Sequence, residues 1–373
     1  MNDNQRKVRS HRKVIAFTMG DPAGIGPEII AKGWSQITRD QDFAFLVFGL
    51  ESTLVQTLES DSGLAVRAFP NLIEFSEWFD GDKYQATVIP VIQNKDWQSI
   101  GDSIPVGQVS DRAGDAAFRF IEAAIQATIS GDIDGIVTAP INKEAIQLAG
   151  HDFPGHTEIL ADRCGVKDFA MMLYIPQGQQ VGGEIGVGVL HTTLHQSLRS
   201  ALDDLSTEKI FATCKLANEF AAASLQQAGV ERQPRIAVAA VNPHAGENGL
   251  FGNEESEIIL PAVQRARDSG IDCTGPLPCD TLMGRAVAGE FDMVVAMYHD
   301  QGHIALKLLG MHKAVNVTVG LPIVRTSVAH GTAFEIAGTG QADCTSLFRA
   351  VEVAKRLATA ATPSHSSNAT PQS

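Results

Sequence analysis

Short apolar runs alternate with amphipathic stretches along most of the chain. The runs at 14–19, 43–48, 135–139 and 293–297 are rich in Val, Ile, Phe and Ala, as expected of strands that are buried on both faces of a sheet. Between such runs, apolar residues recur at helical spacing, most clearly at 111–129. Strands that alternate with helices are typical of a mostly parallel sheet, so the pattern predicts an α/β fold.

The first of these strands leads into a glycine-rich turn. Residues 20–28 read GDPAGIGPE and precede an expected helix. Gly24 and Gly26 do not complete a dinucleotide-binding fingerprint, because Ile29 stands where its third glycine belongs. Pro27 suits the first position of a helix, where a missing N–H costs nothing. The turn is therefore either a plain helix start or a loop whose amides face an anion or a cofactor.

Histidines follow three of the predicted strands. His195, His244 and His299 each come within a few residues of the end of an apolar run. A lone histidine at such a place is usually a hydrogen-bonded loop residue, so it is the repetition that carries the prediction. The carboxyl ends of parallel strands meet at one edge of a sheet. Three imidazoles with an open position suit a catalytic divalent ion such as Zn²⁺, Co²⁺ or Mn²⁺.

A second group of polar residues lies mostly in the C-terminal half. Lys307, Asn316 and Arg325 stand beside apolar stretches, and an ammonium, an amide and a guanidinium together form a receptor for a phosphate monoester. His156 and Thr157 open an expected helix and are either its cap or a polar clamp on a substrate.

Two carboxylates accompany these groups. Asp280 stands in the proline-rich segment 275–281, which is expected to be a loop, and Asp300 directly follows His299.

Composition narrows the class of protein. The chain has 373 residues, 44% of them hydrophobic, which suffices for two lobes with a substantial core. A net charge of −14 argues against nucleic acid or an anionic membrane as the partner. No apolar run approaches the roughly 18 residues of a membrane span. The five cysteines are scattered without a CxxC pair, which predicts reduced thiols in a cytoplasmic protein.

The two ends of the chain are polar. Residues 1–12 are basic and lack the apolar segment of a secretory signal, and residues 361–373 are rich in Ser, Thr, Pro and Asn. We expect both to be flexible tails that do not inform function.

Several blocks of sequence carry a resemblance to a known family. They read MGDPAGIGPE, TAPINKEAI, FPGHTE, NPHAGE, GPLPCDT, YHDQG, NVTVGLPIVRTS and HGTA. In content and order they resemble the 4-hydroxythreonine-4-phosphate dehydrogenase (PdxA) family. The resemblance implies an isocitrate/isopropylmalate dehydrogenase-like fold with two α/β/α lobes and an active site in the cleft between them. One lobe would span 13–150 with 320–360, and the other, 151–319, would hold the metal and the interface of a homodimer with shared active sites.

The resemblance also implies roles for individual residues. The metal ligands would be His195, His244 and His299, usually brought together from both subunits. The substrate-binding residues would be His156, Thr157, Lys307, Asn316 and Arg325, the last three near the phosphate. The catalytic residues would be Asp280, Asp300 and Lys307. The acceptor of the hydroxyl proton is left open between Asp300, His156 and a metal-bound water. No residue is assigned to cofactor binding.

The implied chemistry is oxidation of a secondary alcohol by NAD⁺ with the help of Zn²⁺, Co²⁺, Mg²⁺ or Mn²⁺. The metal would polarise the C3 hydroxyl of a small phosphorylated hydroxy acid. Hydride would pass to the nicotinamide. The product would be a β-keto acid that loses CO₂.

Departures from the family pattern indicate a branch. His303 and Ile304 replace the Leu-Pro that follows YHDQG in the pyridoxal-pathway enzymes. QGHI, LKLLG and NPHAGENGLFG resemble more closely the branch that acts on 4-phospho-D-threonate and 4-phospho-D-erythronate. HTTLHQ resembles a third branch, which oxidises aromatic cis-dihydrodiols, but the retained phosphate receptor favours a phosphorylated substrate. Ala329 replaces the Asp that usually precedes His-Gly-Thr. Among enzymes, the alternative is 4-hydroxythreonine-4-phosphate dehydrogenase of pyridoxal phosphate biosynthesis itself, followed by an aromatic cis-dihydrodiol dehydrogenase. A silent metal- or phosphometabolite-binding protein is the alternative from another class.

Overall fold

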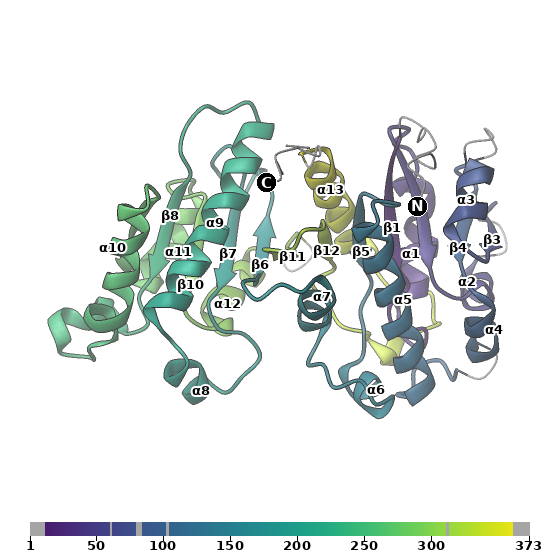
Figure 1. Cartoon of the computed structure of the whole chain (residues 1–373), viewed down its shortest axis with the longest axis horizontal. Helices are drawn as coiled ribbons and strands as arrows, with labels where there is room; N and C mark the ends of the chain where they lie inside the picture. The colour runs from purple at the N-terminus through teal and green to yellow at the C-terminus, as the bar shows by residue number, and fades with distance from the viewer. Residues whose placement is uncertain (1–11, 60–61, 80–83, 102–103, 311–312, 361–373) are drawn as a thin grey trace, which may run out of the picture.

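The computed structural model describes residues 12–59, 62–79, 84–101, 104–310 and 313–360. The expected tails at 1–12 and 361–373 lie outside the described residues, apart from Arg12. One 12-stranded sheet runs through the molecule (Figure 1). Its strands, in sheet order, are β3 (Ala65–Phe69), β4 (Val88–Ile92), β2 (Phe43–Phe48), β1 (Lys13–Thr18), β5 (Gly135–Thr138), β12 (Arg325–Ser327), β11 (Val315–Val319), β6 (Ala170–Ile175), β7 (Val187–His191), β10 (Met293–Ala296), β8 (Arg235–Ala239) and β9 (Asp272–Leu277).

Helices connect most of these strands. The α-helices are α1 (Gly26–Ile37), α2 (Glu51–Thr57), α3 (Leu72–Trp78), α4 (Lys95–Gly101), α5 (Asp111–Ile129), α6 (Lys143–Leu148), α7 (His156–Cys164), α8 (Leu198–Asp203), α9 (Thr207–Gln227), α10 (Leu260–Asp268), α11 (Cys279–Val287), α12 (His299–Gly310) and α13 (Thr345–Ala360). Short 3-10 and π turns are η2 (Pro243–Gly249), η3 (Glu255–Ile259) and η4 (Phe334–Ile336). None of the described helices has both the length and the apolar character needed to cross a membrane.

The sheet consists of two parallel blocks joined by an antiparallel centre. Strands β3, β4, β2, β1, β5 and β12 run parallel to one another, and so do β7, β10, β8 and β9. Between the blocks, β11 pairs antiparallel with both β12 and β6, and β6 pairs antiparallel with β7. Figure 1 shows the two blocks side by side, with α7 near the join. The predicted α/β class and mostly parallel sheet are confirmed.

The local sequence explains the clearest helix. Ser110 accepts a hydrogen bond from the Ala113 amide and so caps α5, which spans the predicted 111–129. Its buried face is made of small and apolar residues that recur at helical spacing and pack on β1 and β5. Pro27 lies in the first turn of α1, but Gly26 is the first helical residue. Predicted strand limits differ from the observed ones by at most two residues, and those of 43–48 coincide with β2.

The core lies on both sides of the sheet. In the first block, Phe17 lies 6.1 Å from both Trp34 and Phe45, measured between ring centroids, and all three side chains are fully buried. In the second block, a smaller apolar cluster lies beneath α11 and α12 and includes Leu282 and Leu306. Each block of the sheet is therefore held by its own close-packed apolar side chains, on either side of the central strands.

One expected loop is structured. Gly275, Pro276 and Leu277 belong to β9, and Asp280 lies in the first turn of α11. The prediction of a loop here was wrong because two prolines do not exclude an edge strand. β9 is the last strand of the sheet, so it pairs with β8 alone.

Candidate active site

A cavity of about 220 Å³ lies between α7, α12 and the central strands β6, β11 and β12. It brings together most of the side chains singled out from the sequence, which come from both blocks of the sheet. Those in its lining are His156, Thr157, His195, His299, Lys307, Asn316 and Arg325. His244, Asp280 and Asp300 are not in its lining. Lys143, Glu158, His303 and His330 also line it, although the sequence did not assign them to the site.

Arg325 is the most deeply buried cation of the cavity. Its side chain is 1% exposed, and its two Nη atoms donate hydrogen bonds to the hydroxyls of Thr318 (2.9 Å) and Thr138 (2.7 Å). Its Nε has no hydrogen-bond partner within the described residues. Burial lowers the pKa of Arg325 to about 9, against the opposing charge of Glu158, so the guanidinium stays protonated at neutral pH. A buried charge held by hydroxyls alone calls for an anion as its partner.

Unpartnered polar atoms cluster in the same cavity. Within the described residues, His156 Nε2, Glu158 Oε2, Asn316 Oδ1 and His330 Nε2 are buried without a hydrogen-bond partner. Buried polar groups in native proteins are nearly always hydrogen-bonded. Several such atoms facing one cavity indicate that a polar ligand or ordered water supplies the missing hydrogen bonds.

His156 begins α7 as the sequence predicted. Burial lowers its pKa well below the usual value, and the charges of Arg325 and Lys143 act in the same direction, so the ring is neutral. Its Nε2 lacks a partner within the described residues. Of the proton acceptors left open by the sequence, His156 is the side chain that lines this cavity.

His195 and His299 lie next to each other. Their ring centroids are 5.7 Å apart, and each side chain is about one-third exposed. A carboxylate faces the Nδ1 of each ring: Asp300 Oδ1 at 2.7 Å from His299, and Glu158 Oε1 at 3.8 Å from His195. A carboxylate at one ring nitrogen orients a histidine so that the other nitrogen can bind a metal. The chemistry of this pair fits two ligands of one divalent ion.

The third predicted ligand is not beside them. Within the described part of one chain, no three histidine, cysteine or carboxylate side chains are arranged to hold a metal. His244 is exposed on η2, where its ring lies 6.3 Å from that of Phe251, measured between centroids. The strands themselves meet as expected, because β7, β10 and β8 are adjacent and parallel. One chain therefore supplies His195 and His299 as neighbours, and His244 apart from them at the same edge of the sheet.

The predicted catalytic carboxylates lie outside the cavity. Asp300 is 68% exposed, accepts from His299 and lines a neighbouring hollow of about 430 Å³ together with Tyr298. Asp280 is exposed, and its carboxylate accepts a hydrogen bond from the Thr281 amide. Both carboxylates face solvent. Their geometry places Asp300 behind His299 and leaves Asp280 apart from the cavity lining.

A buried histidine pair stands behind the cavity. His303 Nδ1 and His191 Nε2 are 3.0 Å apart, and the ring of His303 stacks on that of His299 with 3.8 Å between centroids. Burial lowers the pKa of His191 to about 4. Burial and the nearby His191, His299 and Lys307 lower the pKa of His303 to about 2. The sequence analysis used His303 only to choose between branches of the family. Its spacing of four residues from both His299 and Lys307 is the signal that could have placed it on the same helix face as these two residues.

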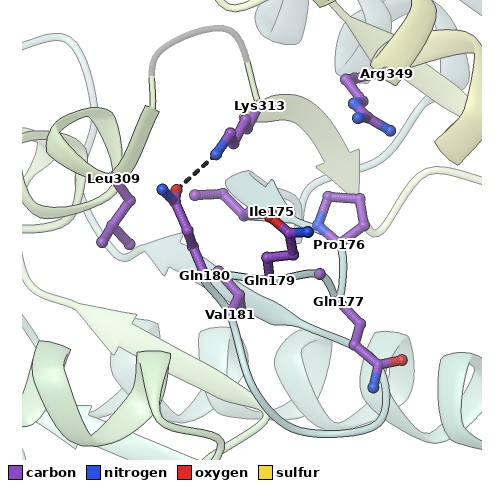
Figure 2. A pocket seen from close by; sticks show the side chains of 10 residues that line it. Ile175, Pro176, Gln177, Gln179, Gln180, Val181, Leu309, Lys313 and Arg349 are labelled. Atoms are coloured by element: carbon purple, nitrogen blue, oxygen red, sulfur yellow. Dashed lines mark hydrogen bonds between the residues drawn. The ribbon is translucent and has the colours of Figure 1, made fainter.

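A second hollow lies away from this site, at the β6–β7 hairpin (Figure 2). It measures about 280 Å³ and is lined by residues 175–181 of the hairpin, three of them glutamines, together with Leu309, Lys313 and Arg349. Its two cations already have partners, since Lys313 Nζ donates to Gln180 Oε1 (2.6 Å) and Arg349 Nη1 to Glu352 Oε2 (2.7 Å). The cavity with the unpartnered Arg325 Nε is therefore the candidate active site.

Comparison with known proteins identifies the family. Residues 44–354 match the family described as pyridoxal phosphate biosynthetic protein PdxA. The chain belongs to the PdxA family. Within the family, it is 44% identical to D-threonate 4-phosphate dehydrogenase of Salmonella typhimurium over 348 residues, which is 93% of this chain and 99% of that protein. It is equally 44% identical to 4-hydroxythreonine-4-phosphate dehydrogenase of Beijerinckia indica over 344 residues, or 92% and 94% of the two chains.

A solved structure of the family has the same fold. The crystal structure of 4-hydroxythreonine-4-phosphate dehydrogenase from Klebsiella pneumoniae is 42% identical, with a TM-score of 0.75 over 93% of this chain and 99% of that one. The relatives are dehydrogenases by name, and this chain is an oxidoreductase of the same class. Identity alone does not separate the two named substrates, because both relatives stand at 44%.

Proposed function

We propose that the protein oxidises a small 4-phosphorylated 3-hydroxy acid, with 4-phospho-D-threonate and 4-phospho-D-erythronate as the best candidates. The observation that carries the proposal is the buried guanidinium of Arg325, whose hydrogen bonds go to hydroxyls and whose Nε is unpartnered within the described residues. Lys307 and Asn316 line the same cavity. An ammonium, an amide and a guanidinium around one space suit a phosphate monoester.

The charge of the cavity supports a substrate with more than one negative group. Lys143, Lys307 and Arg325 line it, against the single carboxylate of Glu158. A phosphate and a carboxylate on one small molecule would balance this excess of positive charge. The name of the Salmonella relative agrees with such a substrate.

The reaction we propose transfers hydride from C3 to NAD⁺ and the hydroxyl proton to a base. A divalent ion held by His195 and His299 would supply Lewis-acid polarisation of the hydroxyl. The chain's own residues bind and orient the substrate: Arg325 and Lys307 hold the phosphate, and His156 presents an unprotonated ring nitrogen to the reacting end. The product is a β-keto acid, which then loses CO₂.

We also propose that the protein works as a homodimer in which His244 of one subunit completes the pair in the other. Apolar side chains are exposed on the edge that carries the histidines. Leu308 is 82% exposed and Ile304 is 58% exposed on α12, Leu198 is 56% exposed on α8, and Leu250 is 71% exposed beside His244. Exposed apolar side chains grouped around a functional site are typical of an interface.

The free cysteines support a reducing, cytoplasmic setting.

The direct test is NADH production by the purified protein with each of Mg²⁺, Mn²⁺, Co²⁺ and Zn²⁺. The substrates are 4-phospho-D-threonate, 4-phospho-D-erythronate and 4-hydroxy-L-threonine 4-phosphate, side by side. We expect NADH from the two sugar-acid phosphates. A preference for the amino acid would move the protein to the reaction named for the Beijerinckia relative, and no NADH from any of the three would contradict the proposal.

A metal assay adds a readout that does not depend on turnover. We expect about one tightly held divalent ion per subunit after dialysis, as in other catalytic metal sites. Changing His299→Ala should abolish metal retention while the thermal unfolding transition stays cooperative. Full metal retention by this variant would refute the assignment of His299.

A further inference from the structure

Lys143 is a cation of the cavity lining that has no ligand assigned to it so far. It is the first residue of α6, whose cap is Asn142, the acceptor of a hydrogen bond from the Ala145 amide. The first turn of a helix favours Asp or Glu, because its amides carry partial positive charge. Within the described residues, the exposed Lys143 ammonium has no hydrogen-bond or ion-pair partner. Neither helix stability nor a salt bridge therefore accounts for a lysine at this place.

Lys143 lies beside Glu158, at the end of the cavity that contains His195. A Cβ on Gly155, which directly precedes α7, would lie 3.3 Å from Glu158 Oε2 and 3.7 Å from Lys143 Cε, so the two side chains flank one point. Glu158 Oε2 is buried without a hydrogen-bond partner among the described residues, and Glu158 Oε1 lies 3.8 Å from His195 Nδ1. Through Glu158, Lys143 is therefore a neighbour of the reacting end of the cavity.

The phosphate and the carboxylate of the proposed substrate stand on opposite sides of the carbon that reacts. In a 4-phosphorylated 3-hydroxy acid, C3 lies between the phosphate-bearing C4 and the acid group on C1. With the phosphate at Arg325 and Lys307 and C3 beside His195, the acid group extends away from the phosphate. Glu158, the carboxylate that faces His195, would repel this acid group. The Lys143 ammonium beside Glu158 offsets the repulsion and supplies a charged hydrogen-bond donor.

We propose, on the basis of the function proposed above, that Lys143 binds the C1 carboxylate of the substrate and selects molecules that carry an acid group as well as a phosphate. The ligand is then held at its two ends by cations from different elements, Arg325 and Lys307 at the phosphate and Lys143 at the carboxylate. Lys143 follows β5, whereas Lys307 lies on α12, which packs on β6, β7 and β10. The bound substrate therefore joins the two blocks of the sheet.

The first test measures binding without turnover. Isothermal titration calorimetry of the full-length protein, with Mn²⁺ and without NAD⁺, compares 4-phospho-D-erythronate with D-erythritol 4-phosphate, in which CH₂OH replaces the carboxylate. We expect the native protein to bind the acid about tenfold or more tightly, and Lys143→Gln to lower this carboxylate preference about tenfold, since a charge-assisted hydrogen bond is lost. Lys143→Arg, which keeps the charge, should retain most of it. An unchanged carboxylate preference in Lys143→Gln would overturn the proposal.

The second test shows which anionic group Lys143 binds. The phosphate preference is the ratio of Kd for D-threonate to Kd for 4-phospho-D-threonate under the same conditions. Arg325→Gln should lower this ratio about tenfold or more, and Lys143→Gln should leave it within about twofold of the native value. A loss of phosphate preference in Lys143→Gln, with its carboxylate preference intact, would place Lys143 at the phosphate and overturn the proposal.

A matched lysine controls for the loss of one positive charge. Lys215 is exposed on α9 and absent from the cavity lining, so Lys215→Gln should change neither preference. An equal loss of carboxylate preference in Lys215→Gln and Lys143→Gln would refute a specific contact at Lys143, while the proposed function stands. Failure of the native protein to bind or oxidise any of the phosphorylated acids would instead refute the proposed function.

Discussion

The surroundings of a single buried charge, Arg325, show a property of the site that its residue type alone does not. Arg325 is buried against threonine hydroxyls, a contact that its sequence position could not show. The sequence predicted its role as a phosphate ligand from chemical type and family resemblance. The unpartnered nitrogen is a structural observation, because the burial of Arg325 depends on β5, whose Thr138 lies 187 residues away along the chain, and on the pairing of β12 with β11.

The Asp21 carboxyl should make stability depend on pH. It is fully buried, Oδ1 accepts from the Ala23 amide (2.9 Å), and Oδ2 is unpartnered within the described residues. Burial raises its pKa from 3.8 to about 6. Above pH 6 the group is ionised both folded and unfolded, and its burial costs roughly 3 kcal/mol. Below pH 4 it is neutral in both states, so this cost disappears as the pH falls between these values.

Asp21→Asn should therefore stabilise the protein at pH 8 by about 1–3 kcal/mol, and the gain should shrink as the pH falls toward 4. Urea denaturation of both proteins at pH 8, 6 and 4.5 measures the difference. A gain that does not change with pH would show that ionisation of Asp21 is not its cause, and a loss at pH 8 would show that the carboxylate is stabilised in the folded state.

At the scale of elements, the sequence predicted the strands better than their pairing. The buried strands of both blocks are apolar runs, and those at β7, β10 and β8 do end at one edge with their histidines. The antiparallel centre could not be read from the sequence, because β12 has three residues and apolar runs look alike in either direction. Nor could the η2 turn, where His244 and Glu247 adopt φ values of 52° and 43°.

A buried carboxylate holds this turn against β8. Glu255 Oε1 accepts from the amides of Val241 (2.8 Å) and Asn242 (2.7 Å), and Oε2 accepts from the Asn242 side chain (2.9 Å). These bonds fix the strand end from which the left-handed turn with His244 starts. A strained turn persists only where its surroundings fix it in this way.

Glu255→Gln should destabilise the protein by about 1–3 kcal/mol, because the amide loses the charge that the two backbone N–H groups bind. Glu254→Gln is the matched control: its carboxylate is less buried and accepts one side-chain bond from Asn242, so its loss should be smaller. Chemical denaturation measures both. Equal losses in the two variants would contradict a special role for Glu255.

For the whole molecule, the two-block sheet agrees with the fold class that the family resemblance implies. One chain alone, however, does not bring the three predicted metal ligands together. His195 and His299 are neighbours, and His244 is exposed on the same edge. No sequence pattern states which histidines come from which subunit, since that depends on how two copies dock. The exposed apolar side chains around α8 and α12 give the docking hypothesis its physical basis.

Mixed dimers test whether His244 acts across the interface. His244→Ala and Lys307→Ala should each be inactive alone. In a purified hybrid of the two, one site would carry both lesions and the other none, so about half of the native activity should return. A hybrid of His195→Ala and Lys307→Ala, whose lesions lie in one cavity, should stay inactive. A silent first hybrid would place His244 in its own subunit's site, and full activity of His244→Ala alone would place it outside the site.

On the proposed function, the cavity around Arg325 receives the phosphate of the substrate. The most direct measurement compares kcat/KM for 4-phospho-D-threonate and D-threonate in the native protein, in Arg325→Gln and in Arg349→Gln, whose arginine is exposed and paired with Glu352. We expect a phosphate preference of about a hundredfold or more in the native protein and in the control, reduced at least tenfold in Arg325→Gln through a higher KM. Equal turnover of the two acids, or a preference unchanged by Arg325→Gln, would contradict the binding of a phosphate at Arg325.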